Sequence, residues 1–169
     1  MSKEEVLRKS KAASDKFLNT DIYKNADTIM LYAPLGNEID TITILKAAMS
    51  DGKKCVLPVT DFETGDITPC EVNDDTQLKK GAFSVLEPVD KKVVNKEEID
   101  VFIVPGIAFD KKGARVGFGK GCYDRLLCGV LATKIGYCYE FQICDEIVSE
   151  SHDIKMDFLI TESGLIRCE

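Results

Sequence analysis

Residues 101–110 read VFIVPGIAFD, and residues 113–125 read GARVGFGKGCYDR. The first stretch opens with four apolar residues that favour β-structure, which predicts a buried strand ending before Pro105. The second stretch has glycines at positions 113, 117, 119 and 121, and glycine lets a backbone adopt positive φ and approach a ligand closely. The apolar pair Leu126 and Leu127 follows and predicts a helix. We therefore expect a strand, a glycine-rich loop and a helix in this order.

The glycine-rich loop is basic, although the chain as a whole is acidic. Backbone N–H groups at the start of a helix favour anions, and nearby cations add to this preference, so the loop is predicted to bind phosphate. The spacing G-x-G-x-G differs from both the dinucleotide fingerprint and the P-loop, and the spacing alone leaves an ordinary glycine-rich turn open. Five cations and two carboxylates lie in this region, a local surplus of three positive charges in a chain of net charge −7: Lys111, Lys112, Arg115, Lys120 and Arg125 against Asp110 and Asp124.

Length and composition limit the classes of protein to consider. A chain of 169 residues with 44% hydrophobic and 30% charged residues predicts a single globular domain over residues 1–169. The net charge of −7 argues against nucleic-acid binding, which needs a basic surface. The chain has no apolar run long enough to span a membrane, and its acidic beginning does not match a signal peptide. We therefore expect a cytoplasmic protein.

The seven cysteines do not form a recognisable pattern. Their number is odd and none are spaced as C-x-x-C, so we expect free, structural thiols rather than disulfides or a zinc site. Cys122 differs from the others because it lies in the glycine-rich loop, where a helix start and nearby cations favour the thiolate.

The order of predicted elements indicates the fold class. Helices are predicted at residues 3–19, at residues 42–49 and from the glycine-rich loop to about residue 131. Strands alternating with helices predict an α/β, Rossmann-like three-layer sandwich with a mostly parallel (mixed) central sheet flanked by helices. Ligands bind beyond the carboxyl ends of such strands, where residues 34–38, 106–124 and 140–142 fall. The strands are predicted at residues 28–33, 54–59, 67–72 (an edge), 83–86, 101–104 (the centre), 134–139, 158–161 and 165–167.

The two motifs together resemble the signature of the 5-formyltetrahydrofolate cyclo-ligase family, also called 5,10-methenyltetrahydrofolate synthetases. That signature joins V-P-G-[LI]-[AG]-F-D to R-[LV]-G-x-G-x-G-Y-Y-D. The chain matches it except at Cys122, where the family has the first tyrosine of the pair. Further matches in the N-terminal helix and at residues 33–41, 55–58, 140–142 and 152–157 extend the resemblance over nearly the whole chain.

The resemblance implies an enzyme that uses ATP and Mg²⁺ to convert 5-formyltetrahydrofolate to 5,10-methenyltetrahydrofolate. The formyl oxygen attacks the γ-phosphate, N10 attacks the activated carbon, and ADP and phosphate are released. Such a reaction needs positioning and charge stabilisation rather than a covalent nucleophile, so Cys122 is not expected to act as one. We expect a monomer that acts on small-molecule substrates, with no nucleic-acid or membrane partner.

The resemblance also assigns site residues. The catalytic residues are Arg115, Lys120 and Tyr123. The expected ATP contacts are Lys3, Arg8, Arg115, Gly117, Phe118, Gly119, Lys120, Gly121, Cys122 and Tyr123. The expected folate contacts are Ala33, Glu38, Phe118, Gly119, Lys120, Gly121 and Cys122. The expected Mg²⁺ ligands are Asp124 and Asp153. Lys3 precedes Arg8 by five residues, whereas the family spacing is four, and the resemblance assigns no role to Gln142.

Several alternatives stay open. Asp124 could cap the following helix, Glu38 could cap the helix from Ile42, and Asp157 could replace Asp153. His152, the only histidine, is expected at the surface or behind the site. For the whole protein, the alternatives are a non-catalytic folate- or nucleotide-binding module and a sugar-phosphate isomerase of related architecture.

Overall fold

The computed structural model of the protein describes all 169 residues, apart from the side chain of Phe83. Its central sheet has seven strands in the order β12-β11-β9-β6-β1-β2-β3. The pairs from β11 to β2 are parallel, whereas β12 and β3 are antiparallel at the two edges. The strands are β1 (Thr28–Met30), β2 (Lys54–Thr60), β3 (Ile67–Val72), β6 (Val101–Val104), β9 (Thr133–Tyr137), β11 (Phe158–Ile160) and β12 (Leu165–Arg167).

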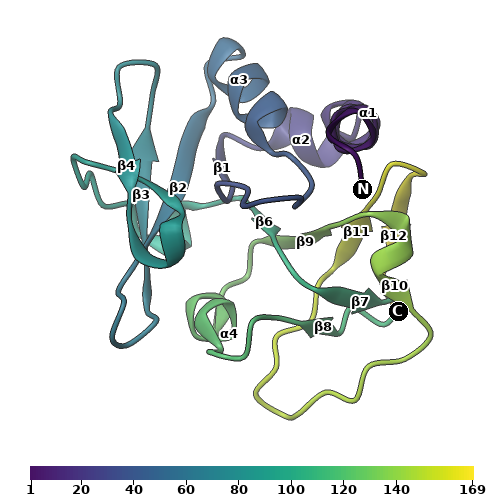
Figure 1. Cartoon of the computed structure of the whole chain (residues 1–169). Coiled ribbons are helices and arrows are strands. Elements are labelled where there is room, and N and C mark those ends of the chain that lie inside the picture. The colour runs from purple at the N-terminus through teal and green to yellow at the C-terminus, as the bar shows by residue number, and fades with distance from the viewer.

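Helices cover one face of this sheet, and a mixed layer covers the other (Figure 1). The first face carries α1 (Lys3–Leu18), α2 (Asp21–Asn25) and α3 (Ile42–Ser50), and the second carries α4 (Cys122–Leu127). Beside α4 lies a small sheet of β10 (Ile143–Cys144), β7 (Ala108–Asp110) and β8 (Arg115–Val116). The remaining elements are the hairpin β4 (Leu78–Lys80) and β5 (Leu86–Pro88) and the 3-10 turns η1 (Ala82–Ser84), η2 (Lys96–Glu98) and η3 (Glu140–Gln142). The predicted fold class is confirmed, with the small sheet supplying much of the second outer layer.

The alternation of side chains along the strands separates two hydrophobic cores. On β6, Val101 and Ile103 pack toward α1 and α3, whereas Phe102 and Val104 pack into the core on the α4 side. All four are at most 2% exposed. A strand buried on both faces reads as a continuous apolar run, which explains why residues 101–104 identify the centre of the sheet.

Two element predictions were wrong in detail. The helix expected to reach about residue 131 ends at Leu127, because Cys128 is extended and Gly129 has φ 75°. The strand expected at 83–86 begins only at Leu86, because residues 82–84 form a 3-10 turn that ends with Ser84 at φ 63°.

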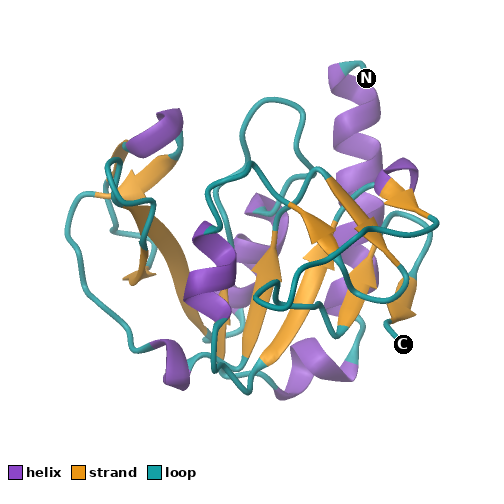
Figure 2. Ribbon diagram, turned by 90° about the horizontal axis from the view of Figure 1, so that it is seen from below, coloured by secondary structure: helices purple, strands orange, loops and turns teal.

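The carboxyl ends of the parallel strands and the N-terminus of α1 lie at the same end of the molecule (Figure 2). A hydrogen bond connects the middle of α1 to the segment after β1, because Ser10 Oγ accepts from the backbone N of Asp40 at 2.9 Å. In α/β sheets, ligand sites lie at this end. None of the described helices combines the length and apolarity needed to cross a membrane.

Candidate active site

Arg115 is held inside the loop that follows β6. Its side chain is 6% exposed, and Nη2 donates to both carboxylate oxygens of Asp124 at 3.2 Å. The guanidinium carbon lies 5.7 Å from the centre of the Tyr123 ring. A Cβ at Gly117 would come within 2.8 Å of Nη1, so the glycine lets the loop close over the guanidinium. Nε of Arg115 is buried without a hydrogen-bond partner among the described residues.

The segment that carries Asp153, one of the two expected Mg²⁺ ligands, contacts the other expected ligand, Asp124. Asp124 Oδ1 accepts from the backbone N of Ile154 at 3.1 Å, directly after Asp153. Asp153 itself accepts from the N of Glu150 at 2.7 Å. Asp124 lies in the first turn of α4, whose N-cap is Gly121, so Asp124 is not the cap. His152 has a side-chain exposure of 71%, which confirms its surface position.

Two glycines of the loop need their special backbone. Gly119 and Gly121 have φ of 88° and 61°, a region that other residues rarely adopt. Lys120, between them, is exposed, and Phe118 is 74% exposed. The exposed backbone and ammonium group provide the donors that phosphate oxygens accept from.

Gly113 serves another purpose. It has φ 84°, and a Cβ there would lie 2.3 Å from the carbonyl oxygen of Met156. Its own carbonyl accepts from Met156 N at 2.8 Å. Gly113 therefore joins the segment after β10 to the end of β7.

Glu38 stands on the opposite side of the candidate site, in the turn after β1. Its Oε2 accepts from Leu35 N at 2.8 Å, so it closes this turn. It does not cap α3, where Asp40 Oδ1 accepts from the N of Ile42. Burial raises the pKa of the Glu38 carboxyl, and the bond from Leu35 opposes that rise. Ala33, before this turn, is 5% exposed.

Tyr123 lies within electrostatic range of both Arg115 and Glu38. Burial raises the pKa of its phenol; the Arg115 charge lowers it, and the Glu38 charge raises it. Glu38 also acts on the buried Tyr32, whose pKa is raised mainly by burial. The turn after β1 and the start of α4 are therefore near enough to interact electrostatically.

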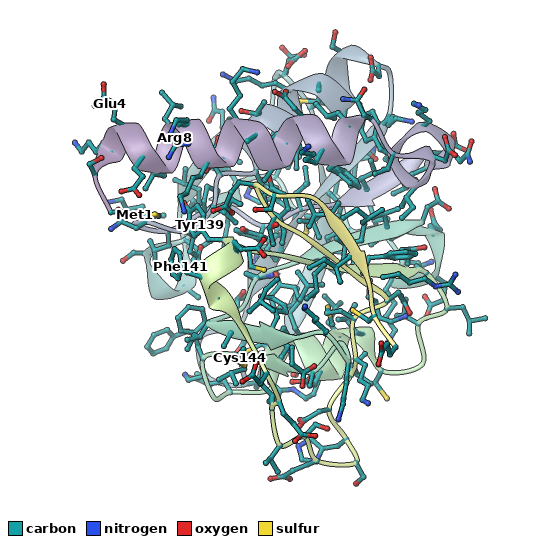
Figure 3. All side chains as sticks on the ribbon, turned by 90° about the vertical axis from the view of Figure 1, so that its right-hand side faces the viewer. Met1, Glu4, Arg8, Tyr139, Phe141 and Cys144 are labelled. Atoms are coloured by element: carbon teal, nitrogen blue, oxygen red, sulfur yellow. The ribbon has the colours of Figure 1, made fainter. Side chains whose placement is uncertain are left out.

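The N-terminal half of α1 borders the same end of the sheet. Figure 3 shows Glu4 and Arg8 on this half, with Tyr139 and Phe141 in the segment beside it. Lys3 and Arg8, the expected ATP contacts, are exposed.

Lys9, which the sequence did not single out, points into the structure. Its Nζ lies 2.7 Å from Glu162 Oε1 and 5.9 and 5.6 Å from the ring centres of Tyr139 and Phe141. Lys9 lies one helical turn before the buried Ala13, so the two share a face of α1. This spacing could have indicated from the sequence that Lys9 faces the protein.

Gln142 has a clear structural role. Its Oε1 accepts from Tyr139 N at 2.8 Å, and its Nε2 donates to the carbonyls of Gly106 and Ile107 at 2.9 and 3.1 Å. One amide thus connects the end of β9 to the loop after β6. Only an amide offers an acceptor and two donors at these positions.

The order of these elements agrees with one known family. The model of the 5-formyltetrahydrofolate cyclo-ligase family matches residues 1–162. The chain belongs to the 5-formyltetrahydrofolate cyclo-ligase family. Its motif departs from the signature at Cys122, which is half-buried at the first position of α4.

Individual relatives agree with this assignment. The chain is 28% identical over 177 residues to mouse 5-formyltetrahydrofolate cyclo-ligase, covering 97% of this chain and 87% of the relative. It is 30% identical over 150 residues to the Haemophilus influenzae enzyme, covering 85% and 80%. The NMR structure of Aquifex aeolicus 5,10-methenyltetrahydrofolate synthetase superposes with a TM-score of 0.87 at 35% identity, over 99% of this chain and 84% of the other.

Proposed function

We propose that this protein is an ATP- and Mg²⁺-dependent enzyme that converts 5-formyltetrahydrofolate to 5,10-methenyltetrahydrofolate, with release of ADP and phosphate. One observation carries the proposal beyond family membership. Arg115 is hydrogen-bonded to Asp124 and lies 5.7 Å from the Tyr123 ring centre, and the charge of Glu38 is near enough to raise the pKa of the Tyr123 phenol. A carboxylate suited to a pterin edge and an arginine suited to phosphate thus both act electrostatically on one aromatic side chain.

The proposed reaction proceeds in two steps. The formyl oxygen attacks the γ-phosphorus of ATP, and ADP leaves. N10 then attacks the activated carbon, and phosphate leaves as the methenyl ring closes. Catalysis rests on holding two substrates in line and on stabilising negative charge.

Lys120 and the backbone N–H groups of Gly117, Gly119 and Gly121 are the proposed phosphate contacts. Lys120 is exposed, and its ammonium is a point charge that can follow a moving phosphate oxygen. Arg115 supplies a fixed positive charge from inside the loop, where Asp124 holds its guanidinium. The Tyr123 phenol stays protonated at ordinary pH because burial raises its pKa, so it can donate a hydrogen bond throughout the reaction.

Asp124 and Asp153 suit Mg²⁺. This ion commonly takes one or two carboxylates and completes its shell with phosphate oxygens and water. Two acids are therefore enough, although no larger cluster of acidic, histidine or cysteine side chains suited to a metal occurs among the described residues. Bound Mg²⁺ would neutralise charge on the transferred phosphate, while Arg115 and the Ile154 N–H hold the Asp124 carboxylate in place.

Glu38 is the proposed partner of the pterin ring. Its side chain is half-buried and one oxygen is already held by Leu35 N, so the carboxylate has a defined orientation. Ionised, it can accept from the amino edge of the pterin. Ala33, Phe118 and Cys122 remain proposed neighbours of the folate, as do the contacts of Lys3 and Arg8 with ATP.

The test is to mix the purified protein with 5-formyltetrahydrofolate and Mg²⁺, with and without ATP, and to follow the near-ultraviolet absorbance of the methenyl product. ATP-dependent growth of this absorbance is the expected result. Folate binding by calorimetry without turnover would instead identify a binding module, and turnover without ATP would contradict the proposal. Sedimentation and cell fractionation test the predicted monomeric state and cytoplasmic location.

A further inference from the structure

The tip of the β2–β3 hairpin, residues 61–66, is a preformed turn. Asp61 Oδ1 accepts from the N of Glu63 and of Thr64, at 2.9 and 2.8 Å. The backbone N of Asp61 donates to Asp66 O, and Gly65 N donates to Asp61 O, both at 2.9 Å. The hydrogen bonds to Asp61 hold the pKa of its carboxyl below the ordinary value. These hydrogen bonds within the tip give it a defined turn conformation.

Arg125 of α4 connects this tip to the glycine-rich loop. Its Nε donates to Asp66 Oδ1 at 2.8 Å, and its Nη2 donates to the carbonyl of Thr64 at 2.9 Å. Its Nη1 donates to the carbonyl of Lys120 at 2.7 Å. One planar guanidinium thus holds two points of the hairpin and one point of the loop. Lysine could not replace this fork, because its donors radiate from a single nitrogen.

Two further contacts join the same tip to the same loop. The ammonium of Lys120 lies 5.6 Å from the ring centre of Phe62. Gly65 faces Cys122 and Arg125 so closely that a Cβ there would lie 3.1 Å from Cys122 Sγ and from Arg125 Nη2. The tip therefore lies against the Lys120 side chain and Cys122, and Arg125 links it to the backbone of Lys120.

We infer that the hairpin tip is a positioning element for the phosphate-binding loop, with Arg125 as the positioning residue. Fixing the Lys120 carbonyl fixes the peptide plane between Lys120 and Gly121, and with it the direction of the Gly121 N–H. Gly119 and Gly121, with their permissive backbones, would otherwise let this segment sample many conformations. The inference rests on the proposed function, since it assumes that this loop binds the phosphates of ATP.

The contacts are too exposed to matter much for global stability. The side chains of Arg125 and Asp66 are 46% and 64% exposed, and exposed ion pairs contribute little. Variants at either position should therefore stay folded, with Tm within about 3 °C of the unmodified protein. A large effect on ATP would then come from loop geometry.

The first experiment measures the flexibility of the loop by its rate of proteolysis, and it does not depend on enzyme turnover. Endoproteinase Lys-C cuts after lysine, and cleavage after Lys120 is followed by mass spectrometry in the unmodified protein, Arg125→Gln and Asp66→Ala. Arg167→Gln is the matched control, because Arg167 is an exposed arginine in β12 at the other edge of the sheet. We expect cleavage after Lys120 to accelerate about fivefold in both hairpin variants and to stay unchanged in the control. Unchanged cleavage in both hairpin variants would overturn the inference.

The second experiment separates positioning from general damage. We expect KM for ATP to rise about five- to tenfold in Arg125→Gln and in Arg125→Lys, with KM for 5-formyltetrahydrofolate changed less than about twofold. Equal rises in both KM values, or faster cleavage with an unchanged KM for ATP, would also overturn it. If the unmodified protein shows no ATP-dependent turnover, the proposed function fails, while the Lys-C result still decides whether the tip holds the loop.

Discussion

Arg115 and Asp124 form a largely buried ion pair, with side-chain exposures of 6% and 20%. Removing one partner of such a pair leaves the other charge uncompensated, which costs about 3–5 kcal/mol. Arg115 therefore contributes to stability as well as to the proposed chemistry. Lys120 is exposed on the loop, with its ammonium 5.6 Å from the ring centre of Phe62, so its removal leaves no buried charge uncompensated.

This contrast predicts different outcomes for two alanine variants. Lys120→Ala should lose at least about 100-fold in kcat/KM with a nearly unchanged free energy of unfolding. Arg115→Ala should lose activity and about 3 kcal/mol of that free energy as well. Urea unfolding and steady-state kinetics on both proteins test this. Equal stability of the two variants would contradict the structural role of Arg115.

Glu38 predicts a pH dependence of folate binding. Burial raises its pKa above the ordinary value for a glutamate, so the ionised form is lost at a higher pH than for an exposed glutamate. Affinity for 5-formyltetrahydrofolate should fall as pH is lowered through this raised pKa. The stability effect has the opposite sign: the neutral acid is favoured in the folded state, so this contribution is present at low pH and is lost as pH rises.

The matched variant is Glu38→Gln, which keeps the shape and removes the titration. Calorimetry from about pH 5 to about pH 8 should show weaker folate binding that no longer has the acidic decline of the unmodified protein. The substrate's own ionisations are common to both proteins, so the difference between the two profiles isolates Glu38. Identical profiles would contradict its role at the pterin.

At the scale of the elements, the side chain of Gln142 holds the loop after β6 against the segment that follows β9. Its amide makes three hydrogen bonds, to Tyr139 N and to the carbonyls of Gly106 and Ile107. Each contributes about 0.5–1.5 kcal/mol. Gln142→Leu should therefore lose about 2 kcal/mol, lowering Tm by about 4–8 °C. Differential scanning calorimetry measures this.

Gln142→Glu separates the donors from the acceptor. It keeps the oxygen that accepts from Tyr139 N but places a carboxylate oxygen against two carbonyls. We expect it to be at least as destabilised as Gln142→Leu at neutral pH. Full stability of Gln142→Glu would show that the two donated bonds contribute nothing.

The elements with buried apolar runs could be predicted from the sequence, whereas those made by long-range pairing could not. Residues 101–104 identify β6 at the centre of the sheet because their side chains are buried on both faces. The short β7, β8 and β10 carry no such signal; β10 exists because Ile143 and Cys144 pair with β7 across more than thirty residues. The same holds for α2, only five residues long.

The candidate site divides in the same way. The glycine-rich loop could be picked out because its residue types and spacing carry chemistry, whereas Glu38 was proposed from the family resemblance alone. The partners of Arg115 were not, because a loop cation gives no sign in the sequence of being buried. The role of Gly113 could not be predicted for a related reason: its positive φ serves a contact with Met156, a residue 43 positions away in the chain.

At the scale of the whole molecule, folding reduces the positive charge that the sequence concentrates around the loop. Three of the five cations between residues 110 and 125 form ion pairs, Lys112 with Glu146, Arg115 with Asp124 and Arg125 with Asp66. Two of these acids, Glu146 and Asp66, come from outside the loop. In the proposed reaction, ATP would therefore approach a protein of net charge −7 whose attracting region is smaller than the sequence suggests.

This distribution predicts a modest dependence of ATP binding on salt. The Debye length falls from about 14 Å to about 4 Å between 0.05 and 0.5 M salt, so the attraction to the exposed Lys120 is screened while the buried Arg115 is screened far less. We expect KM for ATP to rise about two- to threefold over this range. Lys120→Gln should flatten that rise, and the matched variant Arg167→Gln, at the far edge of the sheet, should keep it. A rise as steep in Lys120→Gln as in the unmodified protein would mean that the attraction comes from the summed field of distant charges and not from the loop.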